Sequence, residues 1–528
     1  MKNLAGLNRD FREELGRVRF LDGEIHVIAI SVTFQKTCAI LAVFNRDFRF
    51  TGQKHIYALA KREPRRCGKA KTKTQRKTSM KHTRIFLIAL LGAAAVGLPT
   101  LRGASITVTT INDNGPGSLR QALADAVDGD TINFASSLNG QTITLGSGEL
   151  LVNKSVTING PGANTLTVDA NHASRVFYIA SGKDVTISGL TITNGSAPNP
   201  YFRGGGIYND HATLTVNSCT ISGNSAFPGV GGGIFNHQGT LTVSGSTLSG
   251  NSTWYGGAIS NNWLGGGSAT VTIINSTLTG NSAISAGGGI INQDGTVTLS
   301  NSTVSGNSTE NGGGGIENHA TLVISNSTFS GNSASYGGGI FNEGTLTITN
   351  STVSGNSAGG YSNIYDGRGG AIWNRWTLTV TNSTLSGNSA LTNGGGIYNN
   401  DVAGNAILKI GDTILNAGSS GGNIYNEADG TVTSLGYNLS SDNGGGFLTA
   451  TGDRINTDPR LGPLQNNGGP TFTHMPASNS PAIDAGDATL GMDQRGAGFQ
   501  RVANGRIDIG ATEVQATPAP TPKPHGHH

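Results

Sequence analysis

Charged residues and cysteines are scarce in this chain of 528 residues. Asp, Glu, Lys and Arg together make up 13% of it, aromatic residues make up 6%, and there are three cysteines. Only Cys219 lies beyond residue 105, which excludes a disulfide framework for the larger part of the chain. The low charge, combined with 81 glycines and many Ser, Thr and Asn, is unusual for a globular enzyme.

The net charge of +3 conceals two oppositely charged parts. Residues 1–79 contain 18 Lys and Arg against 7 Asp and Glu, a difference of +11. Residues from 106 onward contain 14 Lys and Arg against 25 Asp and Glu, a difference of −11. This acidic part therefore has no basic face for nucleic acid. The basic run 69–77 fits nucleic-acid contact by composition, but we interpret it as untranslated or solvated.

A hydrophobic run follows a second methionine, Met80. Positive residues precede the apolar stretch 85–98, and the small residues 103–105 follow it. This is the order of a secretory signal peptide, and the stretch is shorter than the roughly 20 residues that a membrane-spanning helix needs. We predict translation from Met80, export, and cleavage near Ser105. The alternative is a basic cytosolic segment followed by a signal anchor.

The acidic part is built on a repeat of about 26 residues. A glycine-rich triplet precedes an isoleucine, and the steps between these isoleucines, from Ile207 to Ile424, are 27, 25, 31, 26, 24, 32, 25 and 27 residues. An asparagine stands two residues after each one: Asn209, Asn236, Asn261, Asn292, Asn318, Asn342, Asn374, Asn399 and Asn426. A second series follows Ser-Gly or Thr-Gly: Asn224, Asn251, Asn281, Asn307, Asn332, Asn356 and Asn388.

Each repeat contains three short runs in which Leu, Val or Ile alternates with Thr or Ser. Such alternation predicts strands. Three strands and three corners per repeat predict one coil of a parallel β-solenoid, whose apolar face is buried only when coils stack. With about 4.8 Å between coils, the asparagines would form a ladder of side-chain amides at a corner. Cys219 is expected to occupy a stacked hydroxyl position.

One clear helical pattern precedes the repeats, at residues 118–126. Ser118 can cap it, with Gln121 three residues later. Its apolar face comprises Leu119, Ala122, Leu123 and Ala126. We expect a short N-terminal capping helix that covers the open first coil.

The repeat resembles that of polymorphic outer-membrane proteins. Gly-Gly-Gly-Ile and Phe329-Ser330-Gly331-Asn332 are similar to the GGA(I/L/V) and FxxN signatures of that family, although most copies here carry Ile, Leu or Val in place of Phe. The resemblance implies an all-β fold, a right-handed parallel β-helix, displayed outside the cell.

Two further stretches resemble elements of bacterial surface β-helix proteins. Residues 118–122, Ser-Leu-Arg-Gln-Ala, are similar to the core of the CSLREA element, with Gly117 in place of its cysteine. Residues 456–464, 480–487 and 508–513 follow the order of the choice-of-anchor Q domain. The resemblance implies attachment to a cell surface, whereas the last residues form a Pro-rich tail without a hydrophobic anchor.

These observations divide the chain into six segments. They are an over-extended N-terminus, disordered or not translated, at 1–79; a signal peptide at 80–105; an N-terminal strand and capping helix at 106–135; the parallel β-helix at 136–450; a choice-of-anchor Q-like C-terminal cap region at 451–515; and a Pro/His-rich tail at 516–528.

Candidate catalytic residues are few. Glycoside hydrolysis needs two carboxylates about 5 to 9.5 Å apart, but the acids of the central repeats fall on different coils. Asp366 and Arg368 share an insertion that suits a sugar acid, although a solvated loop pair is the simpler interpretation. We interpret the adjacent Asp210 and His211 as a corner. The acids are Asp210, Asp294, Glu310, Glu317, Glu343 and Asp366.

The densest charged group lies near the C-terminus: Asp484, Asp487, Asp493, Arg495, Arg506 and Asp508. We favour an Asp–Arg network that closes the last coil over a calcium site. His525, His527 and His528 are interpreted as part of a disordered tail. We therefore expect no metal and no cofactor.

Aromatic residues near the two longest repeats are the candidate glycan-stacking residues, because insertions on repeats cluster on the binding face. They are Trp254, Tyr255, Trp263, Tyr361, Tyr365 and Trp376. Trp373, beside Ile372, is interpreted as a variant of Phe341 or Tyr398.

The favoured hypothesis is an exported, non-catalytic surface β-helix for adhesion or structural display that binds glycans. The alternatives are a polysaccharide lyase or glycoside hydrolase on the same scaffold, and a matrix component with no ligand. We expect a monomer with extracellular glycans or surface proteins as partners and no nucleic acid. Contact with a membrane is expected only through the export signal or an unidentified anchor.

Export can be tested by expressing the full chain in a bacterial host and sequencing the N-terminus of the protein recovered from each cell fraction. The exported protein is expected to start near Ser105, because the apolar stretch and the small residues after it fit signal cleavage. A chain that stays in the cytosol and begins at Met1 would contradict both the start site and the export signal.

Overall fold

The computed structural model describes residues 103–197, 199, 202–263, 268–359, 367–400, 406–487, 491–502 and 505–515. The chain divides into two units, Met1–Leu90 and Leu91–His528, and every described residue belongs to the second. The predicted N-terminal segment, nearly all of the signal peptide and the C-terminal tail lie outside the described residues.

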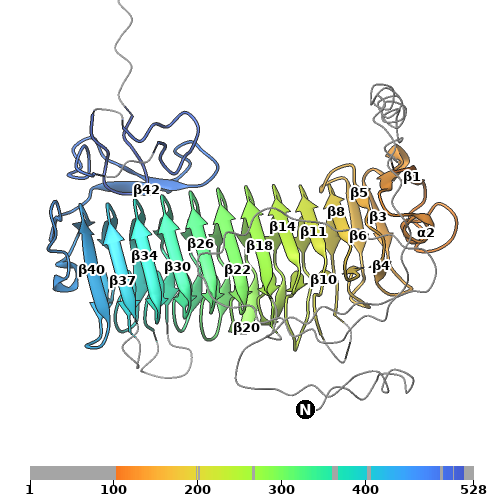
Figure 1. Ribbon diagram of the computed structural model, residues 1–528, viewed down its shortest axis with the longest axis horizontal. Coiled ribbons are helices and arrows are strands. Elements are labelled where there is room, and N and C mark those ends of the chain that lie inside the picture. The colour runs from red at the N-terminus through yellow and green to blue at the C-terminus, as the bar shows by residue number, and fades with distance from the viewer. Residues whose placement is uncertain are drawn as a thin grey trace, which may run out of the picture. The chain divides into compact units, whose positions relative to one another are not determined.

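The described chain winds through stacked coils, and successive coils add one strand each to a set of parallel sheets (Figure 1). Sheet A has 13 strands: β1 (Ser105–Val108), β2 (Thr131–Phe134), β5 (Thr157–Asn159), β8 (Asp184–Ser188), β11 (Thr213–Asn217), β14 (Thr240–Ser244), β18 (Ala269–Ile274), β22 (Gly295–Ser300), β26 (Thr321–Ser325), β30 (Thr345–Thr349), β34 (Thr377–Thr381), β37 (Ile407–Gly411) and β40 (Thr431–Gly436).

Sheets B and D share one long strand, β35. Sheet B comprises β3 (Gln141–Thr144), β6 (Leu166–Asp169), β9 (Thr191–Thr193), β12 (Thr220–Ser222), β15 (Thr247–Ser249), β19 (Thr277–Thr279), β23 (Thr303–Ser305), β27 (Thr328–Ser330), β31 (Thr352–Ser354), β35 (Thr384–Ala390), β38 (Ile414–Ala417) and β41 (Leu439–Ser440). Sheet D comprises β16 (Ser252–Tyr255), β20 (Ser282–Ala286), β24 (Ser308–Thr309), β28 (Ser333–Ala334), β32 (Ser357–Ala358) and β35.

Sheet C has 11 strands and contains the isoleucine and the asparagine of each glycine-led repeat. They are β4 (Leu150–Val152), β7 (Phe177–Ile179), β10 (Ile207–Asp210), β13 (Ile234–His237), β17 (Ile259–Asn261), β21 (Ile290–Asn292), β25 (Ile316–Asn318), β29 (Ile340–Asn342), β33 (Ile372–Asn374), β36 (Ile397–Asn399) and β39 (Ile424–Asn426). The coils pair in register, so that Asn318 lies beside Asn342. The prediction of an all-β parallel solenoid of about a dozen coils is confirmed, while its handedness stays a prediction.

The interior of the coils is filled by aliphatic side chains. In one coil, Ile340 of β29, Leu346 and Ile348 of β30 and Val353 of β31 are fully buried, whereas Thr345 is exposed. Side chains of a strand alternate between its two faces, so the period-2 pattern sends Leu and Ile inward and Thr outward. Each buried aliphatic side chain contributes about 1.5–3 kcal/mol, and in-register stacking joins these residues into one continuous core.

Buried asparagine amides link the coils at two corners. In the glycine-led series each side-chain Nδ2 donates to the Oδ1 of the next asparagine, at 2.6–2.9 Å from Asn209 through Asn426. The second series, from Asn224 to Asn388, repeats the arrangement at 2.8–3.0 Å. Because these side chains, apart from the half-buried Asn426, are almost fully buried, the neighbouring coils must satisfy their hydrogen-bonding groups.

A hydroxyl ladder lies between the two amide ladders. Each backbone N–H donates to the side-chain oxygen one coil further on, at 3.0–3.2 Å, through Ser246, Ser276, Ser302, Ser327, Ser351 and Ser383. Cys219 occupies the first position of this ladder. Burial raises the pKa of its thiol to about 11, so at neutral pH it is a protonated, unreactive thiol.

The glycine triplets have two separate structural roles. Gly313, first in its triplet, has φ +66°, a conformation that favours glycine. A Cβ on Gly314, the second, would lie 2.4 Å from the carbonyl oxygen of Gly338 in the next coil. The third position is alanine in two copies, Ala258 and Ala371. The first two glycines are therefore needed for the turn and for close stacking.

Different segments lie against the first and last coils. Helix α2 (Leu119–Asp125) begins at Ser118, whose side chain accepts a hydrogen bond from the backbone N–H of Gln121, and it buries Leu119, Ala122 and Leu123. A short 3-10 helix, η2 (Ser136–Leu138), follows β2. Near the other end, the turn η3 (Gly444–Gly446) precedes Leu448, which is buried in the main core.

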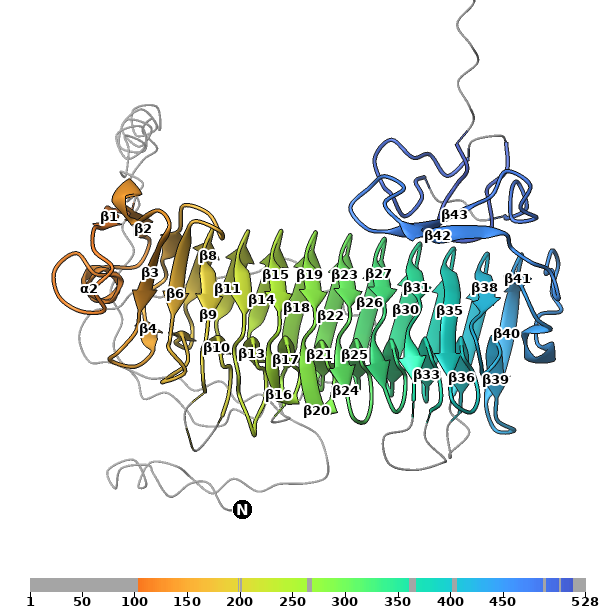
Figure 2. The same cartoon turned by 180° about the vertical axis from the view of Figure 1, so that it is seen from behind.

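The described residues of 457–515 lie along the outer face of sheet B over the last coils, where β42 (Leu461–Gln465) and β43 (Thr473–Pro476) form an antiparallel pair (Figure 2). We expected residues 451–515 to cap the last coil, and this stays a prediction. Outward threonines of sheet B bind part of this region. The Thr328 hydroxyl donates to the carbonyl of Phe472, and the Thr352 hydroxyl donates to Oε1 of Gln494, both at 2.6 Å.

Removal of one amide from the ladder should destabilise the stack. Asn318→Ala takes a donor from Asn342 and an acceptor from Asn292, and buried groups left without partners cost about 1–3 kcal/mol. We expect a loss of that size in the free energy of unfolding by urea.

Asn301→Gly is the matched control for this variant. Asn301 has φ +50°, which glycine adopts easily, and its side chain makes no hydrogen bond among the described residues. Its free energy of unfolding should change by a few tenths of a kcal/mol or less. Equal effects of the two substitutions would show that the amide ladder does not stabilise the fold.

Candidate functional site

The middle residue of each sheet C strand points outward, because the isoleucine and the asparagine on either side point inward. In register, these residues form what we name the sheet C column: Tyr178, Tyr208, Phe235, Ser260, Ile291, Glu317, Phe341, Trp373, Tyr398 and Tyr425. Neighbouring rings contact one another at centroid distances of 5.1–5.6 Å. Leu151 of β4 precedes Tyr178 without a ring, and from Tyr178 to Tyr425 rings are absent only at three consecutive coils, those of Ser260, Ile291 and Glu317.

A second column borders the sheet C column and is interrupted at the same place. This edge column consists of Val230, Tyr255, Ala286, Gly312, Tyr336, Arg368 and Asn393. Its two smallest residues, Ala286 and Gly312, lie beside the coils in which the sheet C column has no ring. A Cβ on Gly312 would lie 2.7 Å from Oε2 of Glu317. The surface is therefore hollow where both columns lack large side chains.

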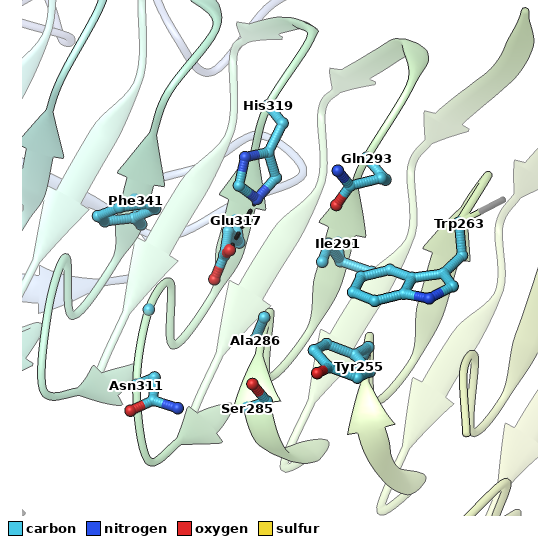
Figure 3. A pocket seen from close by; sticks show the side chains of 11 residues that line it. Tyr255, Trp263, Ser285, Ala286, Ile291, Gln293, Asn311, Glu317, His319 and Phe341 are labelled. Atoms are coloured by element: carbon cyan, nitrogen blue, oxygen red, sulfur yellow. Dashed lines mark hydrogen bonds and ion pairs between the residues drawn. The ribbon is translucent and has the colours of Figure 1, made fainter. Parts of the chain in front are cut away.

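The hollow is a pocket of about 330 Å³ (Figure 3). Trp263 and Tyr255 lie at one end, with ring centroids 4.0 Å apart, and Phe341 lies at the opposite end. Ile291 and Glu317 lie between them. Tyr255 and Trp263 occupy the coil of Ser260, so two coils without rings remain, and at about 4.8 Å each they leave roughly 10 Å between the aromatic ends. This length accommodates one or two sugar rings.

A chain of ion pairs borders the pocket. His319 Nε2 lies 2.8 Å from Oε1 of Glu317, and its Nδ1 lies 2.9 Å from Oε2 of Glu343, which also pairs with Arg375. Burial opposes the positive charge on His319, but the two carboxylates outweigh burial and raise its pKa to about 9. His319 is therefore an imidazolium at neutral pH, and both of its N–H groups donate to carboxylates.

The electrostatics of the pocket are unfavourable for an anion. Burial raises the pKa of Glu317, whose Oε2 faces Gly312 at the pocket floor. The sequence has no Lys or Arg between Arg203 and Arg368. A carboxylate ligand would therefore meet Glu317 without an unpaired cation to balance it. Hydroxyl or amine groups, in contrast, can donate to Glu317, and Gln293 and Asn311 add amide donors and acceptors.

The structure brings together two of the six predicted glycan-stacking residues, Tyr255 and Trp263. Trp254 is 38% exposed and stacks on Phe227 instead, with centroids 5.7 Å apart. Trp376 is 45% exposed at another corner, directly before sheet A. Tyr361, Tyr365 and Asp366 lie outside the described residues. Arg368 lies over the ring of Tyr398, 5.3 Å from its centroid.

The role of Glu317, His319 and Phe341 in a site was not predicted from the sequence. Glu317 was interpreted as one of several acids on different coils, and Phe341 as a repeat position. A usable signal was present: Glu317 directly follows a repeat isoleucine, a position that other copies fill with an aromatic residue. Trp373 does lie in register between Phe341 and Tyr398.

The predicted C-terminal Asp–Arg group is only partly a network. Asp493 and Arg495 form a buried ion pair at 2.5 Å. Asp508 accepts hydrogen bonds from the backbone N–H groups of Asp484 and Val514, and burial raises its pKa. Arg506 lies over the ring of Tyr437 instead. Asp493, Arg495 and Asp508 therefore link the C-terminal loops to one another.

Comparison with known protein families finds a match for one repeat. Residues 326–343 match the family described as the Chlamydia polymorphic membrane protein repeat. No curated protein matches the chain. Among the described residues, no helix combines the length and apolarity required to cross a membrane.

The similar solved structures include a pectate lyase and alginate lyases. The structure of pectate lyase Pel9A has 15% sequence identity and a TM-score of 0.42, over 80% of this chain and 98% of that one. A PL6 family alginate lyase, AlyGC, has 14% identity and a TM-score of 0.35, over 80% and 60%. A PL6 alginate lyase in complex with a trisaccharide has 11% identity and a TM-score of 0.34, over 72% and 93%.

The charge on His319 predicts a pH dependence of stability. Its folded-state pKa of about 9 exceeds the ordinary 6.5, so its contribution is fully present below pH 6.5 and is lost as the pH rises through 9. We expect the free energy of unfolding of the wild type to exceed that of His319→Gln at pH 6, and this difference to shrink by the order of 1 kcal/mol at pH 9.5. Urea unfolding at both pH values measures it, and a constant difference would contradict the ion-paired imidazolium.

Proposed function

We propose that this protein is an exported, non-catalytic surface β-helix that binds carbohydrate in the pocket between Trp263 and Phe341. One observation carries the proposal: the sheet C column and the edge column lose their large side chains at the same coils, with aromatic rings left at both ends. The faces of such rings suit the apolar faces of sugars, and the polar groups between them suit sugar hydroxyls.

Display outside the cell is supported by the sequence. The signal-peptide pattern at 80–105 and the resemblances to the CSLREA element and the choice-of-anchor Q domain support an exported, surface-attached protein. The matched polymorphic membrane protein repeat is consistent with this placement and with a right-handed winding. We propose residues 451–515 as the part closest to the point of attachment.

The ligand class follows from the charges around the pocket. Among the described residues that line the pocket, Glu317 is the only one with a carboxylate, and its Oε1 is already paired with His319. Its Oε2 suits a hydroxyl or amine donor and repels a uronate carboxylate. We therefore propose neutral or amino sugars as ligands, in preference to uronates.

The enzyme hypothesis has less support from the same residues. A lyase needs an unprotonated base, whereas the pKa of His319, about 9, leaves this ring protonated at neutral pH. A glycosidase needs a second carboxylate across the bond, and Glu343, which shares His319 with Glu317, is paired with both His319 and Arg375.

Two substitutions test the pocket by calorimetric titration with neutral, amino-sugar and uronate oligosaccharides. Trp263→Ala removes one ring of the end wall and should weaken binding about five- to tenfold, as expected for one aromatic contact. Gly312→Tyr fills the gap with the residue that the next coil, at Tyr336, already carries, and should abolish binding.

Trp376→Ala is the control, since it removes an exposed ring at another corner and should leave the affinity unchanged. Unchanged affinity in both pocket variants would disprove the site. Incubation with the corresponding polysaccharides tests the competing function: product release that is lost in Glu317→Gln or Arg368→Ala would establish an enzyme.

A further inference from the structure

A second group of side chains converges on sheet C, outside the pocket. Asp210 ends β10, His211 follows it, and His237 ends β13 one coil further on. Oδ1 of Asp210 lies 2.7 Å from Nδ1 of His211 and 3.1 Å from Nδ1 of His237. The two imidazole rings meet edge to face with centroids 4.4 Å apart. Three atoms that commonly bind metal ions therefore face one another.

Each ring nitrogen of His211 has a polar neighbour. Nε2 lies 3.1 Å from the side-chain amide of Gln238, and Nδ1 lies 2.7 Å from Oδ1 of Asp210. A glutamine amide can donate or accept, so the contact at Nε2 is compatible with either tautomer of the ring. The short contact at Nδ1 requires a proton or a metal ion between the two atoms.

The surroundings orient the other two groups. The Tyr178 hydroxyl donates to Oδ2 of Asp210 at 2.6 Å, which leaves Oδ1 toward the histidines. The ring of Phe235 stacks on His237 with centroids 5.6 Å apart, and the Tyr208 hydroxyl lies 3.0 Å from Nδ1 of His237. A partner that holds a ligating carboxylate in place, as Tyr178 holds Asp210, is typical of metal sites. The Tyr208 hydroxyl contacts the His237 nitrogen that would bind the ion, so this contact must be released when the ion binds.

We propose that Asp210, His211 and His237 bind a divalent transition-metal ion of the zinc type. Two imidazole nitrogens and one carboxylate oxygen are a usual ligand set for this ion, at bond lengths of about 2.0–2.2 Å. Ligand atoms around a tetrahedral ion lie about 3.3 Å apart, so a slight separation of the three groups admits it. The His211 side chain is 41% exposed, which leaves one side open for water or a ligand.

The ion would link two consecutive coils through β10 and β13. This proposal departs from our expectation that the chain binds no metal. It is independent of the carbohydrate pocket, which begins at Tyr255 and Trp263. Asp210 and His211 are adjacent in sequence, but His237 joins them only through the in-register pairing of Asp210 with His237.

Cobalt(II) is the probe, because it occupies zinc-type sites and absorbs visible light when it is tetrahedrally bound. The background is the full chain with His525→Ala, His527→Ala and His528→Ala, since the C-terminal histidines would bind metal themselves. We expect one equivalent of cobalt to bind, visible absorption that zinc displaces, and a higher midpoint of thermal unfolding with either ion.

In the same background, His211→Ala should weaken cobalt binding at least tenfold. This residue is exposed, so the variant should fold, and its unfolding midpoint without metal verifies this. His237→Ala should have the same effect. His319→Ala, which alters the histidine of the pocket, should bind cobalt as the background does. Absence of a cobalt signal in the background chain, or equal binding by His211→Ala, would overturn the proposal.

Discussion

The structure depends on the hydrogen bond that each buried asparagine amide donates to the next coil. An amide in the interior has no water to bind, and the side-chain oxygen at 2.6–3.0 Å in the adjacent coil takes its place. This oxygen is available only when the coils pair without a shift in register. The aliphatic core favours any compact stack, whereas the two amide ladders favour the one register in which every repeat position meets its equivalent.

Because the coils pair in register, equivalent sequence positions form columns. These columns build the surface features as well as the core. The residue between the inward isoleucine and the inward asparagine always points outward, so a repeat that prefers Tyr, Phe or Trp there builds a row of rings. The polar residue after the asparagine builds a second row, in which Asp210 meets His237, and His319 meets Glu343. Both candidate sites of the molecule arise from these rows.

The fold was largely predictable from the sequence because it depends on local pattern and period. The alternation of Leu346 and Ile348 with threonine and the constant spacing of isoleucine and asparagine predicted strands, coils and the positions that stack. The pocket was not predictable in the same way. The pocket forms because Ala286 and Gly312 of the edge column lie beside Ile291 and Glu317 of the sheet C column. The sequence alone does not show that these two columns are neighbours.

The place of the C-terminal region also escaped prediction. The sequence shows that residues 457–515 depart from the repeat, but not which surface they cover. That choice depends on the hydroxyls of Thr328 and Thr352, which look the same in sequence as the threonines of earlier coils. Long-range hydrogen bonds of this kind do not produce a repeating pattern in the sequence.

The gap at Ala286 and Gly312 has an evolutionary consequence. A cavity made by leaving side chains out requires no new loop and no change in the backbone, since the coils above and below keep their paths. Point mutations that exchange small and bulky residues along the edge column can therefore open, close or move a recognition site in steps of one rung, about 4.8 Å. Proteins with this scaffold can therefore change their ligands while the core residues and amide ladders that determine the fold stay the same.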